Sequence, residues 1–106
     1  MINRYEVVYS SKALEDLRNL YRYIALKLKV PGTAKRKNER LRKAIRSLEY
    51  LPARHAVYDA EPWKSMGMHK LSVVNHVIFY LIDEVNFVVS IIRIVYSGTN
   101  VDDLQI

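Results

Sequence analysis

Two histidines lie within residues 67–84, a stretch that reads as two β-strands joined by a polar break. His69 and Lys70 lie within GMHKLSVV, and His76 follows in NHVIFYLIDE. An imidazole with an ordinary pKa near ~6.5 can act as a base or an acid, and nearby cations can stabilise a phosphorane transition state. These residues suggest phosphodiester chemistry, and the alternative is that each histidine is only structural.

Further side chains in the same half of the chain can take part. Tyr96 ends the last apolar stretch and can hydrogen-bond a phosphate, although a tyrosine on a strand is often only packed. Arg93 interrupts that stretch with a charge, so it is either a member of an ion pair or a phosphate ligand. Lys64 can converge with Lys70 on the histidines from the same segment. Because side chains alternate along a strand, His69 and Lys70 must point to opposite faces.

Metal chemistry is not indicated by the sequence. The chain has no cysteine, which excludes thiolate sites and disulfides, and its histidines lack the His-x-x-x-His spacing of common zinc motifs. We therefore expect neither a metal nor another cofactor. The acidic pairs are expected to be turn and tail residues, and they are Asp83 with Glu84 and Asp102 with Asp103.

A basic segment, KRKNERLRKAIR, contains seven basic residues and one acidic residue. At helical spacing its cations spread over the face opposite the leucines, so they can face a phosphate backbone. The alternative is an ordinary solvated helix face. The formal net charge of +6 also favours an anionic partner. We expect RNA contacts from Arg36, Arg40 and Lys43, and we expect Lys37 to extend outward from the apolar arc.

The elements that position these residues follow from apolar periodicity. YEVVYS predicts an N-terminal strand, with Ser10 as the N-cap of a helix over residues 11–29. VPGT predicts a turn in which Thr33 caps a second helix over residues 34–50. Three strands are expected over 68–73, 76–82 and 87–96, with a short extra strand near 55–58.

These elements define an α+β fold, in which an N-terminal strand and a two-helix hairpin precede a three- to four-stranded, largely antiparallel sheet. The strand over 87–96 is apolar on both faces, which predicts a central position. A chain of 106 residues suits one core, so we expect a single domain over 1–106. VIFYLI is far shorter than the roughly 20 residues that span a bilayer, and MINRYEVVYS does not resemble a secretory signal. A cytoplasmic protein without a membrane partner is expected.

The order of YEVVYSSKALEDLRNLYRYIA, AIRSLEYLPAR, EPWKSMG, VVNHVIFYLIDE and VSIIRIVYSG resembles the RelE/ParE superfamily of bacterial type II toxins over nearly the whole chain. The resemblance implies a small toxin neutralised by a cognate antitoxin that is small, acidic and partly disordered. RelE-like members cut mRNA in the ribosomal A site without a metal. ParE-like members instead inhibit DNA gyrase and are not nucleases.

The leading hypothesis is ribosome-dependent mRNA cleavage, with the ribosome and mRNA as partners. The alternatives are gyrase inhibition and a degenerate module that only binds antitoxin. In RelE-like nucleases, basic, tyrosyl and histidyl residues position the phosphate, activate the 2′-hydroxyl and protonate the leaving oxygen. The resemblance thus implies acid–base roles for His69, His76 and Tyr96, and phosphate binding by Lys64, Lys70 and Arg93.

Overall fold

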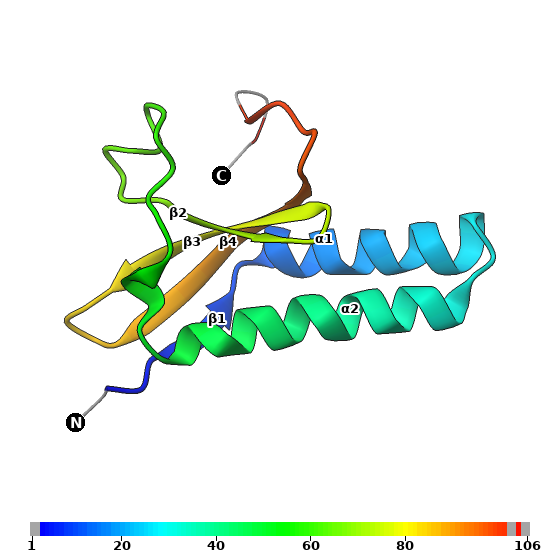
Figure 1. Cartoon of the computed structure of the whole chain (residues 1–106), viewed down its shortest axis with the longest axis horizontal. Helices are drawn as coiled ribbons and strands as arrows, with labels where there is room; N and C mark the ends of the chain where they lie inside the picture. Colours follow the sequence, from blue (N-terminus) through cyan, green and yellow to red (C-terminus); the bar gives the residue numbers. More distant parts are fainter. Residues whose placement is uncertain (1–2, 102–103, 105–106) are drawn as a thin grey trace.

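A computed structural model describes residues 3–101 and residue 104. A helical hairpin covers one face of a four-stranded sheet (Figure 1). The predicted α+β arrangement is therefore confirmed. The helices are α1 (Ser11–Arg22) and α2 (Pro31–Arg46), and the strands are β1 (Glu6–Tyr9), β2 (His69–Val73), β3 (His76–Asp83) and β4 (Val88–Tyr96).

β4 is one of the two inner strands of the sheet, so the central position that its two apolar faces predicted is confirmed. The strand order is β1-β4-β3-β2, in which β3 pairs antiparallel with both neighbours and β1 runs parallel to β4. Val89 and Ile91 pack under the helices, whereas Ile92 and Val95 belong to the core on the other face. Burying both faces of β4 joins the two layers into one structure.

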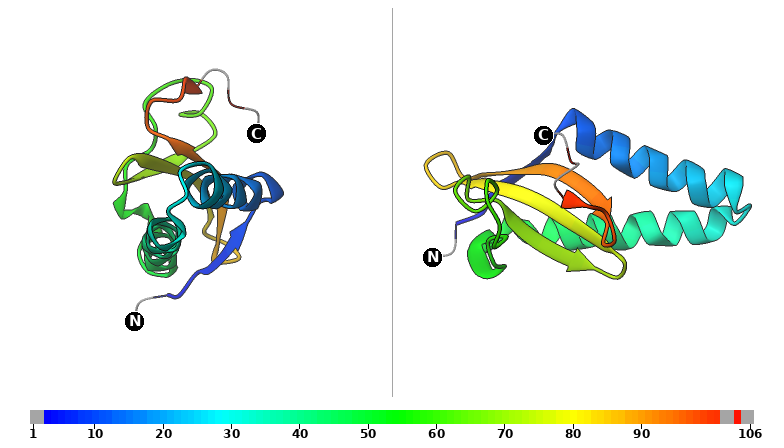
Figure 2. Two further views of the ribbon diagram at one scale, coloured as in Figure 1. Left: turned by 90° about the vertical axis from the view of Figure 1, so that its right-hand side faces the viewer. Right: turned by 90° about the horizontal axis from the view of Figure 1, so that it is seen from above.

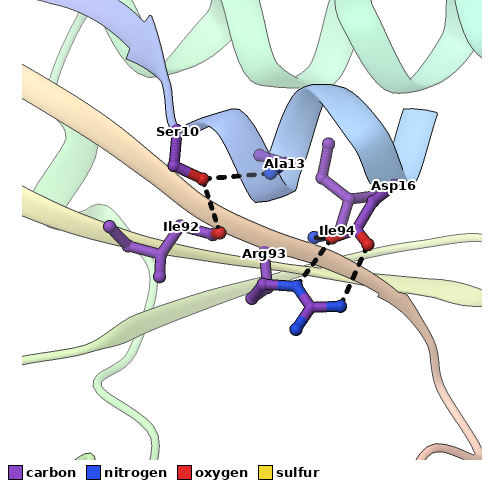
Figure 3. Close-up of polar contacts among 6 residues, drawn as sticks. All are labelled: Ser10, Ala13, Asp16, Ile92, Arg93 and Ile94. Atoms are coloured by element: carbon purple, nitrogen blue, oxygen red, sulfur yellow. Dashed lines mark hydrogen bonds and ion pairs between the residues drawn. The ribbon is translucent and has the colours of Figure 1, made fainter. Parts of the chain in front are cut away.

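The start of α1 closes the edge of β4 where β1 ends. β1 pairs with β4 only as far as Ile91. Beyond that point the Ser10 hydroxyl donates to the Ile92 carbonyl at 2.8 Å and accepts from the Ala13 amide at 3.0 Å (Figure 3). The predicted N-cap at Ser10 is therefore confirmed, and the same hydroxyl also ties the helix to the sheet.

The hairpin differs from the prediction at the end of its first helix and at the start of its second. α1 continues as a π-helical segment, Tyr23–Lys27, and the common end of the two helices extends past the strands (Figure 2). α2 begins at Pro31, so Thr33 lies inside its first turn and does not cap it. The expectation of a Thr33 cap was wrong because proline lacks an amide hydrogen and has a helix-compatible φ, which suits it to the first helical position. Two 3-10 turns follow, Ser47–Glu49 and Pro52–Arg54.

Loop segments cover the second face of the sheet (Figure 1). Trp63 and Met68 pack there against Phe79 and Val95. The loop is attached to the outer edge of β2, and the strand expected near 55–58 is reduced to a single bridge between Val57 and His69. Among the described residues, no helix is long and apolar enough to cross a membrane.

Candidate functional site

A groove lies between the helical hairpin and the end of β4, and we call it the strand-end groove. It has a volume of about 540 Å³. Its walls are mainly apolar, with a few polar groups that could act on a ligand. The lining residues are Asp16, Asn19, Leu20, Tyr23, Ile24 and Leu28 from the α1 side, Lys37 from α2, and His76, Ile94 and Tyr96 from the strands.

Two of the predicted catalytic residues meet in this groove. His76 begins β3 and pairs in register with Tyr96, the last residue of β4. Their rings are 6.0 Å apart between centroids, in an edge-to-face arrangement. Tyr96 is 59% exposed, so its hydroxyl is available to a ligand. The sheet register therefore brings an imidazole and a phenol together, as the nuclease hypothesis requires for acid–base work.

The environment of His76 keeps its imidazole neutral. The residue is only 7% exposed, and its Nδ1 atom has no hydrogen-bond partner among the described residues. Burial lowers the pKa of His76 below its ordinary value of 6.5, and the positive charge of Lys37 lowers it further. At neutral pH this side chain can accept a proton or a hydrogen bond.

His69 lies far from this groove. Its ring stacks on Tyr80 with a centroid distance of 5.3 Å, and its Nδ1 lies 2.7 Å from the His55 carbonyl oxygen. His69 is opposite Tyr80 in the register and Val73 is opposite His76, so the two histidines are four residues apart along the strands. At the usual rise per residue this is about 13 Å, so they cannot act on the same phosphate.

The lysines of the same segment do not converge on either histidine. Lys70 points to the opposite face, where its ammonium lies 5.4 Å from the ring centroid of Tyr58. Lys64 pairs with Asp59 at 3.2 Å in a loop where both side chains are largely exposed. The expected convergence of Lys64 and Lys70 was wrong, because strand alternation and loop 55–67 direct them elsewhere.

Arg93 takes the structural one of the two roles left open by the sequence. Its guanidinium donates to both carboxylate oxygens of Asp16, at 2.9 and 3.0 Å, and both side chains are mostly buried (Figure 3). Asp16 also accepts the Ile94 amide at 2.9 Å. The pKa of Arg93 is raised mainly by its hydrogen bond to Asp16. This pair fastens α1 to β4.

The predicted RNA-binding residues on α2 are exposed. Arg36 and Arg40 line a shallow hollow next to Val74 in the β2–β3 turn, and Arg36 donates to the Thr33 hydroxyl at 3.1 Å. Lys43 lies outside that hollow, one turn further along the helix.

Sequence reasoning missed the role of one lysine in the site. Lys37 was expected only to extend outward from the apolar arc, but it lines the strand-end groove and acts on the pKa of His76. No spacing signal links a helix residue to a strand residue so far along the chain. No group of three or more histidine, aspartate or glutamate side chains that could hold a metal occurs in the described part of the chain. Asp102 and Asp103 lie outside the described residues.

Comparisons with known proteins agree with this architecture. Similar solved structures include a chromosomal ParDE system from P. aeruginosa, with a TM-score of 0.69, 18% identity and coverage of 88% of this chain and 96% of that one. The RelBE2 toxin–antitoxin complex from Mycobacterium tuberculosis gives 0.62 at 20% identity, covering 88% and 98%. The archaeal RelE–RelB complex from Pyrococcus horikoshii OT3 gives 0.53 at 16% identity, covering 92% and 99%.

At these identities the structural likeness is one of fold. No sequence among curated proteins matches the chain. A family model described as the ParE toxin of the type II toxin–antitoxin system, parDE, matches residues 7–100. This match spans most of the 106 residues and agrees with the resemblance seen in the sequence. The chain therefore belongs to the ParE toxin family of type II toxin–antitoxin systems, within the RelE/ParE superfamily.

Proposed function

We propose that this toxin acts by binding DNA gyrase and that it does not cut mRNA. The observation that favours gyrase binding over mRNA cleavage is the separation of the residues expected to form a nuclease site. A metal-free nuclease needs its acid, base and phosphate ligands within reach of one phosphate. Here His69 lies about 13 Å along the strands from His76, Arg93 is held by Asp16, and Lys70 lies over Tyr58.

The choice of gyrase as the target rests on the family. ParE-like toxins inhibit gyrase without nuclease activity, and the family model that matches this chain is that of ParE toxins. The mRNA-cleavage hypothesis favoured by the sequence thus becomes the second candidate.

An acidic antitoxin is the partner that we propose for the strand-end groove and the free edge of the sheet. Tyr23, Leu28 and Ile94 offer apolar contacts beside the ammonium of Lys37. In the described residues no strand pairs with the outer edge of β1. Just before β1, the Tyr5 amide donates to the Glu49 carbonyl at 2.7 Å and Arg4 forms a single bridge with Tyr50. A partly disordered chain can place an apolar helix face in the groove and add a strand to that edge.

A paired assay tests the proposed target. Purified toxin should inhibit DNA supercoiling by purified gyrase, and primer extension on actively translated transcripts should show no new cuts. Cuts within translated codons, together with unaffected supercoiling, would overturn the proposal. If neither effect appears while antitoxin still binds, the chain is a module that only binds antitoxin.

One observation favours mRNA cleavage as a second candidate function. His76, Tyr96 and Lys37 line the same groove, and a neutral imidazole beside a phenol and an ammonium is a workable acid–base set. On this candidate, Tyr96→Phe abolishes transcript cleavage, whereas the control Tyr50→Phe, also an exposed tyrosine, does not. On the gyrase proposal, Tyr96→Phe and Tyr50→Phe inhibit supercoiling to the same extent.

A further inference from the structure

A second groove lies between the two helices, and we call it the interhelical groove. It has a volume of about 210 Å³, and no residue of the sheet lines it. Three of its side chains are arginines, and none is acidic. The lining residues are Leu14, Leu17, Arg18, Tyr21 and Arg22 from α1, with Asn38 and Arg42 from α2.

The three arginines are exposed and have no carboxylate partner within the described residues. The ion pairs among the described residues join other side chains and leave out Arg18, Arg22 and Arg42. Asn38 contributes a buried side-chain oxygen that has no hydrogen-bond partner among the described residues. Three like charges around one groove repel one another, so this arrangement contributes nothing evident to folding. An arrangement without a structural benefit indicates a ligand.

We propose that the interhelical groove binds the phosphodiester backbone of nucleic acid. A guanidinium presents a planar fork of donors that matches two phosphate oxygens, and it loses less hydration on binding than an ammonium. Arg18 and Arg22 are one turn apart on α1, and Arg42 faces them from α2. Arg46, one turn beyond Arg42 and exposed, extends the second row. Two rows of cations can hold a backbone along its length.

The contrast between the two grooves favours nucleic acid over an acidic protein as the ligand. An amphipathic helix needs apolar anchors, and the strand-end groove supplies them with the exposed side chains of Tyr23 and Leu28. The interhelical groove also has an exposed apolar side chain, Tyr21, but among the described residues it has three guanidinium groups and no carboxylate. The cations of the strand-end groove, by contrast, are limited to Lys37 in the described part of the chain, and Asp16 also lines that groove. This inference does not depend on gyrase being the target, because a backbone contact is independent of sequence and of the partner enzyme.

The test measures binding of the full-length toxin to a fluorescently labelled 20-base-pair DNA duplex by anisotropy, over a series of salt concentrations. The variant Arg18→Gln/Arg42→Gln removes one guanidinium from each helix. The control Lys27→Gln/Lys29→Gln removes the same charge from the end of the π-helical segment and the turn after it, outside the groove. We expect the groove variant to bind at least roughly tenfold more weakly and to lose about two units of salt-dependence slope. The control should change both quantities far less.

Three further measurements decide the alternatives. An equal loss in both variants would mean that only total charge matters, which overturns the proposal. Poly-glutamate that binds as tightly as the duplex, and no longer binds to the same variant, would make the groove a carboxylate site. That result would also overturn the proposal.

A single-stranded RNA of the same length distinguishes DNA from RNA as the source of the phosphates. If the glutamine variant fails to fold, Arg18→Lys/Arg42→Lys keeps the charge and should still weaken duplex binding, because it loses the planar fork.

Discussion

The carboxylate of Asp16 binds the guanidinium of Arg93 through two hydrogen bonds, and one of its oxygens also accepts the Ile94 amide. One side chain on α1 thus satisfies a buried charge and a backbone donor on β4. These three contacts lie beyond Ile91, the last residue of β4 that pairs with β1.

Replacing Asp16 should therefore destabilise the fold. Asp16→Ala leaves Arg93 and the Ile94 amide without their partner, so we expect the free energy of unfolding to fall by about 2–4 kcal/mol. Asp16→Asn keeps one acceptor and should cost less. Urea denaturation measures both, with the exposed neighbour Glu15→Ala as the control. Equal stability of Asp16→Ala and Glu15→Ala would contradict the structural role.

The stability of the toxin should fall as the pH drops below about 6.5. Burial and Lys37 hold the pKa of His76 below its ordinary value, so the unfolded chain takes up a proton first. The free energy of unfolding therefore decreases from about pH 6.5 down to the lowered pKa, and this group adds no dependence above that range. His55 contributes with the same sign, because burial and then Arg54 lower its pKa.

Denaturation curves between about pH 5 and pH 8 measure this dependence. His76→Gln should flatten part of the slope, and His55→Gln should flatten a further part. A slope unchanged in the His76 variant would show that this imidazole titrates normally in the folded toxin.

Tyr80 should stabilise the junction between the sheet and the 3-10 turn at Pro52. Its hydroxyl donates to the Pro52 carbonyl at 2.6 Å, and burial raises the pKa of Tyr80 to about 12. Tyr80→Phe leaves that carbonyl unsatisfied, so we expect a loss of about 1–3 kcal/mol in the free energy of unfolding. Tyr50→Phe, at an exposed position, should change stability little. Thermal melts compare the two, and similar losses would argue against the buried hydrogen bond.

The antitoxin should raise the melting temperature of the toxin, because it binds only the folded state. We expect it to be a small acidic protein encoded beside the toxin. Lys37→Glu reverses the charge in the strand-end groove and should weaken the complex, whereas Lys43→Glu on an exposed face of α2 should weaken it less. Isothermal titration calorimetry measures both affinities. Equal losses of affinity would show that the antitoxin does not bind in the strand-end groove. If the neighbouring gene product formed no complex with the toxin, that result would count against the toxin assignment.

The mRNA-cleavage candidate makes its own prediction about α2. If the exposed cations of α2 contact ribosomal RNA, the triple variant Arg36→Gln/Arg40→Gln/Lys43→Gln should weaken co-sedimentation with ribosomes and reduce its salt dependence. Its melting temperature should stay near that of the unmodified toxin, because these side chains are exposed. An unchanged salt slope would make them an ordinary solvated face.

Local signals in the sequence predicted most of the fold. Ser10 as an N-cap, the helix that follows it and the two apolar faces of β4 each depend on a few neighbouring residues, and each was confirmed. The register was not available from such signals, so the pairing of His76 with Tyr96 could not be foreseen. The partner of Arg93 was undetermined for the same reason, since Asp16 is 77 residues away along the chain.

The site was predicted less well than the fold because it depends on which side chains meet. His69 and His76 look like neighbours in sequence, but they are far apart in the antiparallel hairpin of β2 and β3. His76 lies beside the turn, whereas His69 lies at the end of β2 that is far from the turn. Lys37 reaches the groove only because the hairpin folds back over the end of β4. Such contacts are set by packing between distant segments, and spacing along one segment does not record them.

The parallel pairing of β1 with β4 sets an order for folding during synthesis. Of the four strands in the described residues, β1 is made before the others and its ladder partner β4 after them, and the Ser10 hydroxyl needs the Ile92 carbonyl. Contacts between such distant segments form late because a long loop must close first. β1 therefore stays without its ladder partner until β4 has been made. The sheet of this toxin therefore cannot be complete before β4 has been made, and until then the ladder edge of β1 has no strand to pair with.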